Sequence, residues 1–317
     1  MIISEEQVKQ FMEKGWVRIK AAIPREMALE AQNEIWSILN AKCGISQEKA
    51  SWHTPFYQLS ENYRHGIFGA CTTPRLMGAI EELIGNGRLD AGYEQDGVPF
   101  GWWPINFSLG STEDWDVPVG GWHWDGLHFR HYIDSPEQGL LMIVMYSDVE
   151  ARGGGTLLAE GTHKLVAQFL AQYPDGIEYK DAIPIMNRSN PWLAELTGSY
   201  GDVADEDRKE IYTTDQIHSI PTGEDRIQKF MEQDYVDENG VRLRVVEATG
   251  EAGDVLLCHP FIYHTGSQNH SGRARIMCNI NTPLKEKMRL NRDNDSDHSV
   301  LEQSIRQALG MTQSSCS

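Results

Sequence analysis

Short apolar runs separated by glycine occupy the chain from residue 100 onward, and they limit the possible folds more than any other feature. Runs with the length and residue types of strands lie at 102–109, 140–146, 156–159, 254–258 and 273–281. Groups of two or three consecutive glycines interrupt them, as turns would. This pattern predicts a β-sandwich or barrel whose mouth can hold a site.

The first third of the chain carries helix signals instead. Residues 4–14 begin with the spacing of a capping box, and residues 24–40 begin with a proline suited to a first helical turn. A further helix is expected over 74–84, where glycines follow as a stop signal. Between the first two helices, residues 16–20 alternate like a short strand.

We expect one domain over residues 1–317, mainly β with flanking helices. Its predicted parts are a helix-rich N-terminal support (1–99), a β core (100–164 and 251–285), an insert (165–250) and a C-terminal helix and tail (286–317). The insert breaks the strand rhythm with a polar, acidic stretch. Long structureless segments are rare in compact domains, so it is predicted to be a lid or an oligomer contact in a possible homo-oligomer.

Charge and composition exclude several partners. The net charge is −18 with only 28 Lys and Arg, so a nucleic acid backbone would be repelled over most of the surface. No window has the length of apolar sequence that a membrane span needs, and the N-terminus lacks a signal-peptide profile. The five cysteines are scattered without paired spacing, which argues against disulfides and a thiolate zinc site. We therefore expect a cytoplasmic protein without a membrane or nucleic acid partner.

Two segments carry metal-binding chemistry. His123-Trp124-Asp125 is the only His-x-Asp among the eleven histidines. On an extended segment, residues two apart project to the same side, so one imidazole and one carboxylate could bind one metal ion. Such a triplet also occurs by chance, and alone it is a weak signal.

The second segment is an apolar run that ends in His264, with Arg275 eleven positions later. A strand, a glycine-containing turn and an antiparallel return would bring Arg275 beside the metal. Two histidines and one carboxylate leave coordination positions open, an arrangement that lets iron(II) bind a 2-oxoacid and O2, whereas zinc prefers closed or hydrolytic sites. A guanidinium binds a carboxylate through two parallel hydrogen bonds, so Arg275 could hold the 2-oxoacid.

Three stretches extend this pattern: GWHWDG at 121–126, GGGTLLAEGTHK at 153–164 and GDVLLCHPFIYHTGSQNHSGRAR at 253–275. With them, the chain resembles the phytanoyl-CoA dioxygenase (PhyH) family of iron(II)/2-oxoglutarate-dependent oxygenases. The resemblance extends from about residue 5 to residue 283 and matches 165–250 poorly. It implies a double-stranded β-helix core of the jelly-roll, cupin-like kind, with Fe(II), 2-oxoglutarate and O2 as cofactor and co-substrates.

The resemblance also assigns roles to residues. It implies that His123, Asp125 and His264 bind iron and that Arg275 holds the distal carboxylate of 2-oxoglutarate. Tyr146 would line the co-substrate pocket. Where the family often has a hydroxyl residue, this chain has glycine at 266, and either neighbour, Thr265 or Ser267, could serve instead.

The substrate is expected to be a small polar or anionic molecule, such as a secondary metabolite, that is hydroxylated or cleaved after hydroxylation. Residues beside the metal motif are its candidate contacts: Asn106, Trp122, Trp124, His128 and Arg130. Two other functions stay open. A non-catalytic β-barrel could keep the ligands for a structural metal, and a cupin-like zinc hydrolase would need a general base that the sequence does not show. His259 could compete with His264, but it is expected to bond backbone at a strand end.

Overall fold

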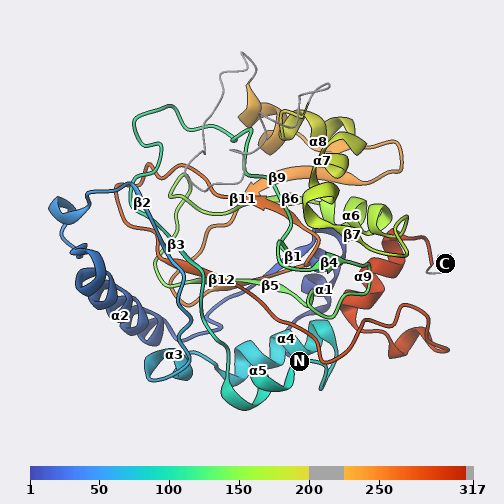
Figure 1. Ribbon diagram of the computed structural model, residues 1–317, viewed down its shortest axis with the longest axis horizontal. Helices are drawn as coiled ribbons and strands as arrows, with labels where there is room; N and C mark the ends of the chain where they lie inside the picture. Colours follow the sequence, from blue (N-terminus) through green and yellow to red (C-terminus); the bar gives the residue numbers. More distant parts are fainter. Residues whose placement is uncertain (200–224, 312–317) are drawn as a thin grey trace.

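Two four-stranded antiparallel sheets form the centre of the computed structural model, which describes residues 1–199 and 225–311 (Figure 1). The first sheet has the order β1 (Trp16–Ile19), β10 (Val255–Cys258), β5 (Leu141–Met145) and β12 (Met277–Asn281). The second has the order β11 (Tyr263–Thr265), β6 (Leu157–Glu160), β9 (Arg242–Glu247) and β8 (Tyr235–Val236). A further pair, β2 (Phe56–Leu59) and β3 (Trp103–Asn106), lies beside β12, because Asn106 and Arg275 form an antiparallel bridge.

The path of the chain between the sheets defines a jelly roll. Strand β5 belongs to the first sheet, β6 and β9 to the second, β10 to the first, β11 to the second and β12 to the first. The chain thus winds around the space between the sheets, as the two strands of a β-helix do. The predicted fold class, mainly β with flanking helices around a double-stranded β-helix, is confirmed.

Alternate residues of the central strands pack into two different hydrophobic clusters. Leu141 and Ile143 of β5 and Leu256 of β10 point between the sheets, where they meet Leu158 of β6. Met142, between the first two, joins a larger cluster with the surrounding helices. Because both faces of β5 are covered, every one of its residues is buried, and the strand appears in the sequence as a continuous apolar run.

Helices lie on the outer faces of the sheets (Figure 1). The N-terminal ones are α1 (Glu5–Lys14), α2 (Arg25–Cys43), α3 (Ile67–Ala70), α4 (Pro74–Ile84) and α5 (Ala91–Asp96). The others are α6 (Thr162–Leu170), α7 (Tyr179–Ser189), α8 (Pro191–Leu196) and α9 (Val300–Ala308), with a short pair β4 (Arg130–His131) and β7 (Ile177–Glu178). The capping box at Ser4 and the cap at Thr73 are formed as predicted. Within the described ranges, no helix is long and apolar enough to cross a bilayer.

The predicted division of the chain needs two corrections. Residues 165–250 are not an insert outside the core, because β9 pairs along β6 and completes the second sheet. Residues 1–99 do more than support the core, because β1 pairs with β10 in the first sheet. Both errors have one cause: strand pairing joins segments far apart in sequence, and local patterns do not show it. Residues 200–224, on which part of the lid or oligomer-contact prediction falls, lie outside the described residues.

Candidate metal centre

Three side chains meet between the sheets in a metal-binding arrangement. One ligand atom each from His123, Asp125 and His264 can be chosen so that all lie within 4.8 Å of one another. The Oδ1 atom of Asp125 is 3.6 Å from the Nε2 atom of His123 and 3.6 Å from the Nε2 atom of His264. Two imidazoles and one carboxylate on one side of a divalent cation leave further coordination positions open. The triad predicted from sequence is therefore assembled by the fold.

Backbone pairing positions the two histidines. His123 donates its N–H to the carbonyl of His264 at 3.1 Å, and His264 donates back to the carbonyl of His123 at 2.8 Å. Gly121, with φ of +77°, sets the turn into this bridge, and a Cβ atom there would lie 2.7 Å from Oγ1 of Thr265. Only glycine fits such a close approach in this conformation without strain.

Hydrogen bonds select the tautomer of each imidazole. Nδ1 of His123 lies 2.6 Å from the carbonyl oxygen of Gly121, and Nδ1 of His264 lies 3.2 Å from that of Ile262. Since a carbonyl only accepts, each Nδ1 must carry the proton and donate it. Each Nε2 then keeps a free lone pair directed toward Asp125, as a metal ligand requires.

The charges within the triad are coupled. Burial alone would raise the pKa of Asp125, but the imidazoles of His264 and His123 outweigh it and the pKa is lowered. Burial, reinforced by His123, lowers the pKa of His264 to about 4. Burial also acts to lower the pKa of His123, yet its contact with Asp125 raises it overall. An ionised carboxylate beside a neutral His264 is a donor set that suits a divalent metal.

Arg275 lies in the same space without an anionic partner. Its side chain is only 4% exposed, and Nη1 donates to the carbonyl of Pro104 at 2.7 Å. The Nε atom is buried and has no hydrogen-bond partner, and no ion pair to a described carboxylate is formed. Burial lowers the pKa of Arg275 to about 9, an effect that the carboxylate of Glu247 partly opposes, so the side chain is protonated at neutral pH. A buried cation with an unused donor is costly unless an anion binds it.

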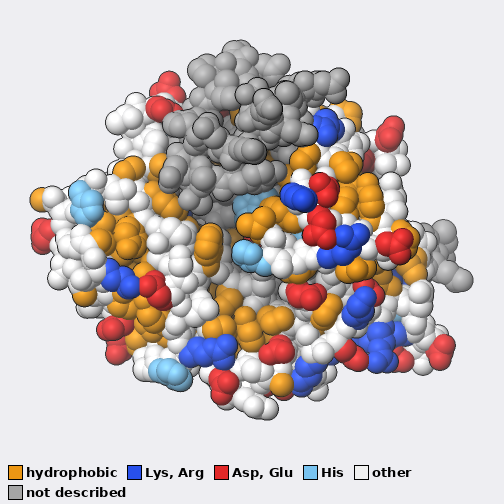
Figure 2. Space-filling view, viewed as in Figure 1, with side chains coloured by type: hydrophobic (Ala, Val, Ile, Leu, Met, Phe, Trp, Pro, Cys, Tyr) orange, Lys and Arg blue, Asp and Glu red, His pale blue; other side chains and the backbone are white. Residues whose placement is uncertain are grey.

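The triad and Arg275 open into one cavity of about 570 Å³. Figure 2 shows histidine and apolar side chains around a hollow on this face of the molecule. The side chains of His123 and Asp125 are 35% and 29% exposed, so the metal position is open to the cavity. A space of this size accommodates a small-molecule ligand.

Three more predicted residues line the cavity: Thr265, His128 and Asn106. Thr265 donates from Oγ1 to the carbonyl of Gly120 at 3.4 Å, a long bond, and His128 is exposed. Asn106 has both ends of its amide engaged, because Nδ2 donates to the carbonyl of Ser267 and Oδ1 accepts from the N–H of Leu109. Asn106 therefore joins the segments that contain Leu109 and Ser267 at the cavity wall.

Two residues predicted beside the co-substrate lie outside the cavity lining. Tyr146 is fully buried on the other face of the first sheet, where its ring packs against Phe100 and Trp103. It directly follows Met145, which points between the sheets, and the alternation of a strand turns it outward. Ser267 is buried and donates its hydroxyl to the carbonyl of Gly155 at 2.7 Å. Of the two hydroxyl candidates, Thr265 is the one at the cavity.

The tryptophans beside the metal motif and Arg130 also lie outside the lining. Nε1 of Trp122 donates to the carbonyl of Pro118, and Nε1 of Trp124 donates to Nδ1 of His131. Both rings are buried in the core, because the residues flanking two inward ligands on an extended segment must point away. Arg130 pairs with Glu178 at 2.7 Å across β4 and β7. These three residues therefore have structural roles. His259, as predicted, takes no part in the triad.

Several cavity residues escaped the sequence interpretation: Asn62, Tyr93, Trp102, Asn279 and Asn281. The two asparagines on β12 could have been found, because positions 275, 279 and 281 share a face of one strand. The others come from loops and α5, and nothing local to them signals where the chain returns.

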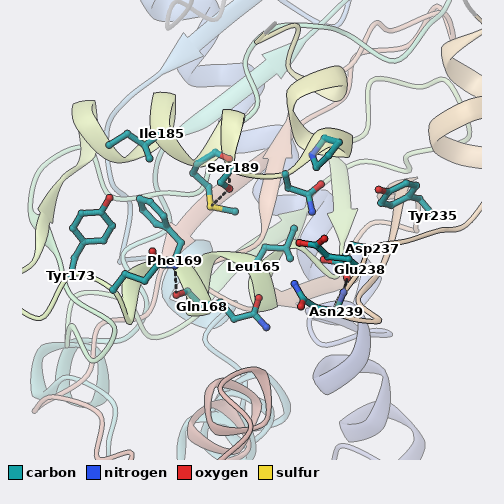
Figure 3. Close-up of a pocket in the computed structure, with 14 residues that line it drawn as sticks. Leu165, Gln168, Phe169, Tyr173, Ile185, Ser189, Tyr235, Asp237, Glu238 and Asn239 are labelled. Carbon is teal, nitrogen blue, oxygen red and sulfur yellow. Dashed lines mark hydrogen bonds between the residues drawn. The ribbon is translucent and has the colours of Figure 1, made fainter. Parts of the chain in front are cut away.

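A second cavity of about 330 Å³ lies between α6, α7 and the turn after β8 (Figure 3). One of its two carboxylates, Asp237, accepts from the N–H groups of Asn239 and Val241 and so stabilises that turn. Asn190 at its edge caps α8. Asp237 and Asn190 thus have structural partners, and this cavity holds no cluster like the triad among the described residues.

Comparison with known proteins identifies distant likenesses only. No family model matches the chain, and no curated protein matches its sequence. Among solved structures, it is similar to the non-heme α-ketoglutarate-dependent epimerase SnoN from nogalamycin biosynthesis, with a TM-score of 0.47 and 14% identity over 87% of this chain and 80% of that one. HygX from Streptomyces hygroscopicus, with nickel and 2-oxoglutarate bound, gives a TM-score of 0.45 and 12% identity over 88% and 86%. EctD from S. alaskensis, in its apoform, gives 0.43 and 13% over 87% and 75%. The particular resemblance to phytanoyl-CoA dioxygenases stays a prediction.

Proposed function

We propose that this protein is an iron(II)- and 2-oxoglutarate-dependent oxygenase that acts on a small molecule. The observation that carries the proposal is the position of Arg275: a buried guanidinium without an anionic partner opens into the same cavity as a two-histidine, one-carboxylate triad. A metal site alone does not require such a cation. A co-substrate that has a chelating end and a distal carboxylate requires both.

The donor set favours iron(II) among the divalent metals. A structural zinc site is normally closed by four protein ligands, whereas His123 and Asp125 are partly exposed to the cavity. A zinc hydrolase would need a general base near the metal, and Asp125 is the sole carboxylate among the described cavity-lining residues. Three facial ligands with open positions are the arrangement of non-haem iron oxygenases.

The residues that would hold 2-oxoglutarate follow from their chemistry. Its 2-oxo acid end would share the metal with His123, Asp125 and His264, and its distal carboxylate would accept hydrogen bonds from Arg275. Thr265, whose hydroxyl lies at the cavity and makes one long hydrogen bond, is the candidate for an additional contact. Ser267 is excluded from this role by its bond to Gly155.

When bound, iron(II) with 2-oxoglutarate and O2 supplies the oxidising power for the substrate C–H bond, while the co-substrate is converted to succinate and CO2. The protein's contribution is to bind and orient the reactants. The hydrogen bonds that the Nδ1–H groups donate to the carbonyls of Gly121 and Ile262 hold the imidazole rings and their tautomers. Apolar side chains that line the cavity, among them Leu109 and Phe129, would limit water around the site.

An anaerobic titration tests the proposal. Iron(II) followed by 2-oxoglutarate should produce a weak visible charge-transfer band that needs both additions. The band should be absent in His264→Ala. Arg275→Gln should bind iron normally and require much more 2-oxoglutarate. Well-folded protein that binds iron but shows no band at saturating 2-oxoglutarate would exclude the proposed function and favour a structural metal.

A further inference from the structure

We infer that the cavity binds an uncharged, ring-bearing molecule with several hydroxyl groups, and that Trp102 and three asparagines select it. The inference rests on the proposed function, since it concerns the substrate of the same site. The three asparagines are Asn62, Asn279 and Asn281. It keeps the sequence-based expectation of a small polar molecule and drops the anionic alternative, because Arg130, one of the residues on which that alternative rested, binds Glu178.

The charges of the cavity argue against an ionic substrate. Among the described residues that line it, Asp125 is the one carboxylate and Arg275 the one guanidinium. In the proposed function, Asp125 binds the metal and Arg275 binds the co-substrate, so neither is left for a charged substrate. A substrate with a fixed ammonium or carboxylate group would lose its hydration in the cavity without gaining an opposite charge, which is unfavourable.

The asparagines provide free hydrogen-bonding groups instead. The side-chain amides of Asn62, Asn279 and Asn281 have no hydrogen bond to any described residue, and Oδ1 of Asn279 is buried without a partner. Asn279 and Asn281 lie two apart on β12 and so share one face of the strand. An amide both donates and accepts, as a hydroxyl group does. A row of unused amides therefore suits a molecule with several hydroxyls.

Trp102 gives this wall an apolar surface. Trp102 lines the cavity and is 52% exposed, although its backbone has a φ of +50°. That conformation is unfavourable for a bulky residue, and such strain is found more often at functional sites. The carbonyl of Trp102 accepts a hydrogen bond from the N–H of Asn279 at 3.0 Å, so the backbone keeps these two residues side by side.

The close fit around these residues keeps the wall in place. A Cβ atom on Gly101 would lie 1.6 Å from Oδ1 of Asn62, so glycine is required for Asn62 to reach the cavity beside Trp102. Tyr93 donates its hydroxyl to the carbonyl of Asn281 at 2.9 Å, which leaves its ring at the cavity wall. Aromatic rings beside amides can bind the apolar face of a ring and its hydroxyls together.

Binding of three matched probes tests the inference: phenyl β-glucoside, its 6-amino-6-deoxy analogue, which is a cation at pH 7, and phenyl β-glucuronide, which is an anion. Calorimetry would use the full chain with nickel(II) and 2-oxoglutarate, so that no turnover occurs. The glucoside should bind at least about tenfold more tightly than either charged analogue. Trp102→Ala should weaken its binding by about tenfold, the scale of an aromatic contact together with its buried area.

A charge swap gives the sharper test. Asn279→Asp should shift the preference toward the amino analogue, whereas Asn86→Asp, in an exposed turn, adds the same charge outside the cavity and should not. Equal or tighter binding of a charged probe to the parent protein, unchanged binding by Trp102→Ala, or no binding of any probe would overturn the inference. The charge-transfer band tests the proposed function separately, because it requires no substrate.

Discussion

His123 and His264 lie directly opposite each other in an antiparallel bridge, and each donates its N–H to the carbonyl of the other, at 3.1 and 2.8 Å. Their imidazole centroids are 4.5 Å apart, with Asp125 Oδ1 3.6 Å from both Nε2 atoms. The backbone thus brings together two metal ligands that are far apart in sequence. Since main-chain bonds set this distance, the backbone itself holds the two imidazoles in position for one metal ion.

Removal of the carboxylate ligand should abolish tight metal binding. Asp125→Ala leaves two imidazoles, and we expect iron(II) affinity to fall by at least about 100-fold, more than a typical change around a metal ligand produces. Metal content after dialysis would measure it. Asp114→Ala, an exposed substitution outside the triad, is the control. Full metal retention by Asp125→Ala would mean that the metal binds elsewhere.

Arg275 should affect the co-substrate and not the metal. Arg275→Gln removes the charge that we assign to the distal carboxylate, and 2-oxoglutarate affinity should fall by roughly 10- to 100-fold, as loss of a charged hydrogen-bonding partner implies. Arg275→Lys should restore part of it, because lysine keeps the charge but lacks the planar donor pair. Isothermal titration with the nickel(II) form would give both values. Equal 2-oxoglutarate affinity in all three proteins contradicts the assignment.

Gly121 should be required for the geometry of the site. Gly121→Ala forces a Cβ atom to 2.7 Å from Oγ1 of Thr265 at a φ of +77°, so it should lower both the thermal midpoint and metal affinity. Gly44→Ala is a matched control, since Gly44 has a φ of +72° with nothing within 4 Å of its Cβ position. The control should lose about 1 kcal/mol from the left-handed backbone alone. If both variants lose equal stability and neither loses metal affinity, the contact with Thr265 is unimportant.

Two buried histidines should make the fold sensitive to acid. His163 and His259 have ring centroids 4.9 Å apart, and burial, together with Lys164, lowers the pKa of His163 to about 3. Burial and the neighbouring His163 hold the pKa of His259 well below its usual value. Both are neutral in the folded protein at pH values where the unfolded chain binds protons. The contribution of these two histidines to stability should therefore be fully present above about pH 6.5 and be lost as pH falls from there toward 3.

The slope of this decrease tests the pair. Each histidine contributes up to about 1.4 kcal/mol per pH unit to the free energy of unfolding. His163→Gln should lose part of this slope between pH 6.5 and 5, whatever its stability at pH 7.5, whereas the exposed His65→Gln should keep it. Urea unfolding at several pH values gives the comparison. An unchanged slope in His163→Gln would show that this histidine does not remain neutral in the fold.

The sequence, together with its resemblance to a known family, indicated the metal ligands. His123 and Asp125 are two apart on an extended segment, which places them on one face but is a weak signal by itself. The resemblance implied all three ligands, including His264 at the end of an apolar run. The capping box at Ser4 was equally readable, because it depends on residues three apart. Features of this kind depend on residues close together in the sequence, so strand and helix geometry predict them directly.

Tertiary structure decided what depends on the return of distant segments. The way β5 sits in the first sheet leaves Tyr146 on the side away from the cavity. The pairing of β9 with β6 places part of the expected insert in the core. Trp102 and Asn62 reach the cavity from segments whose own sequence carries no sign of it. The alternation along a strand decides on which side of the sheet a side chain lies. What that side chain meets depends on which distant segments pair with the strand, and the local sequence pattern does not specify those partners.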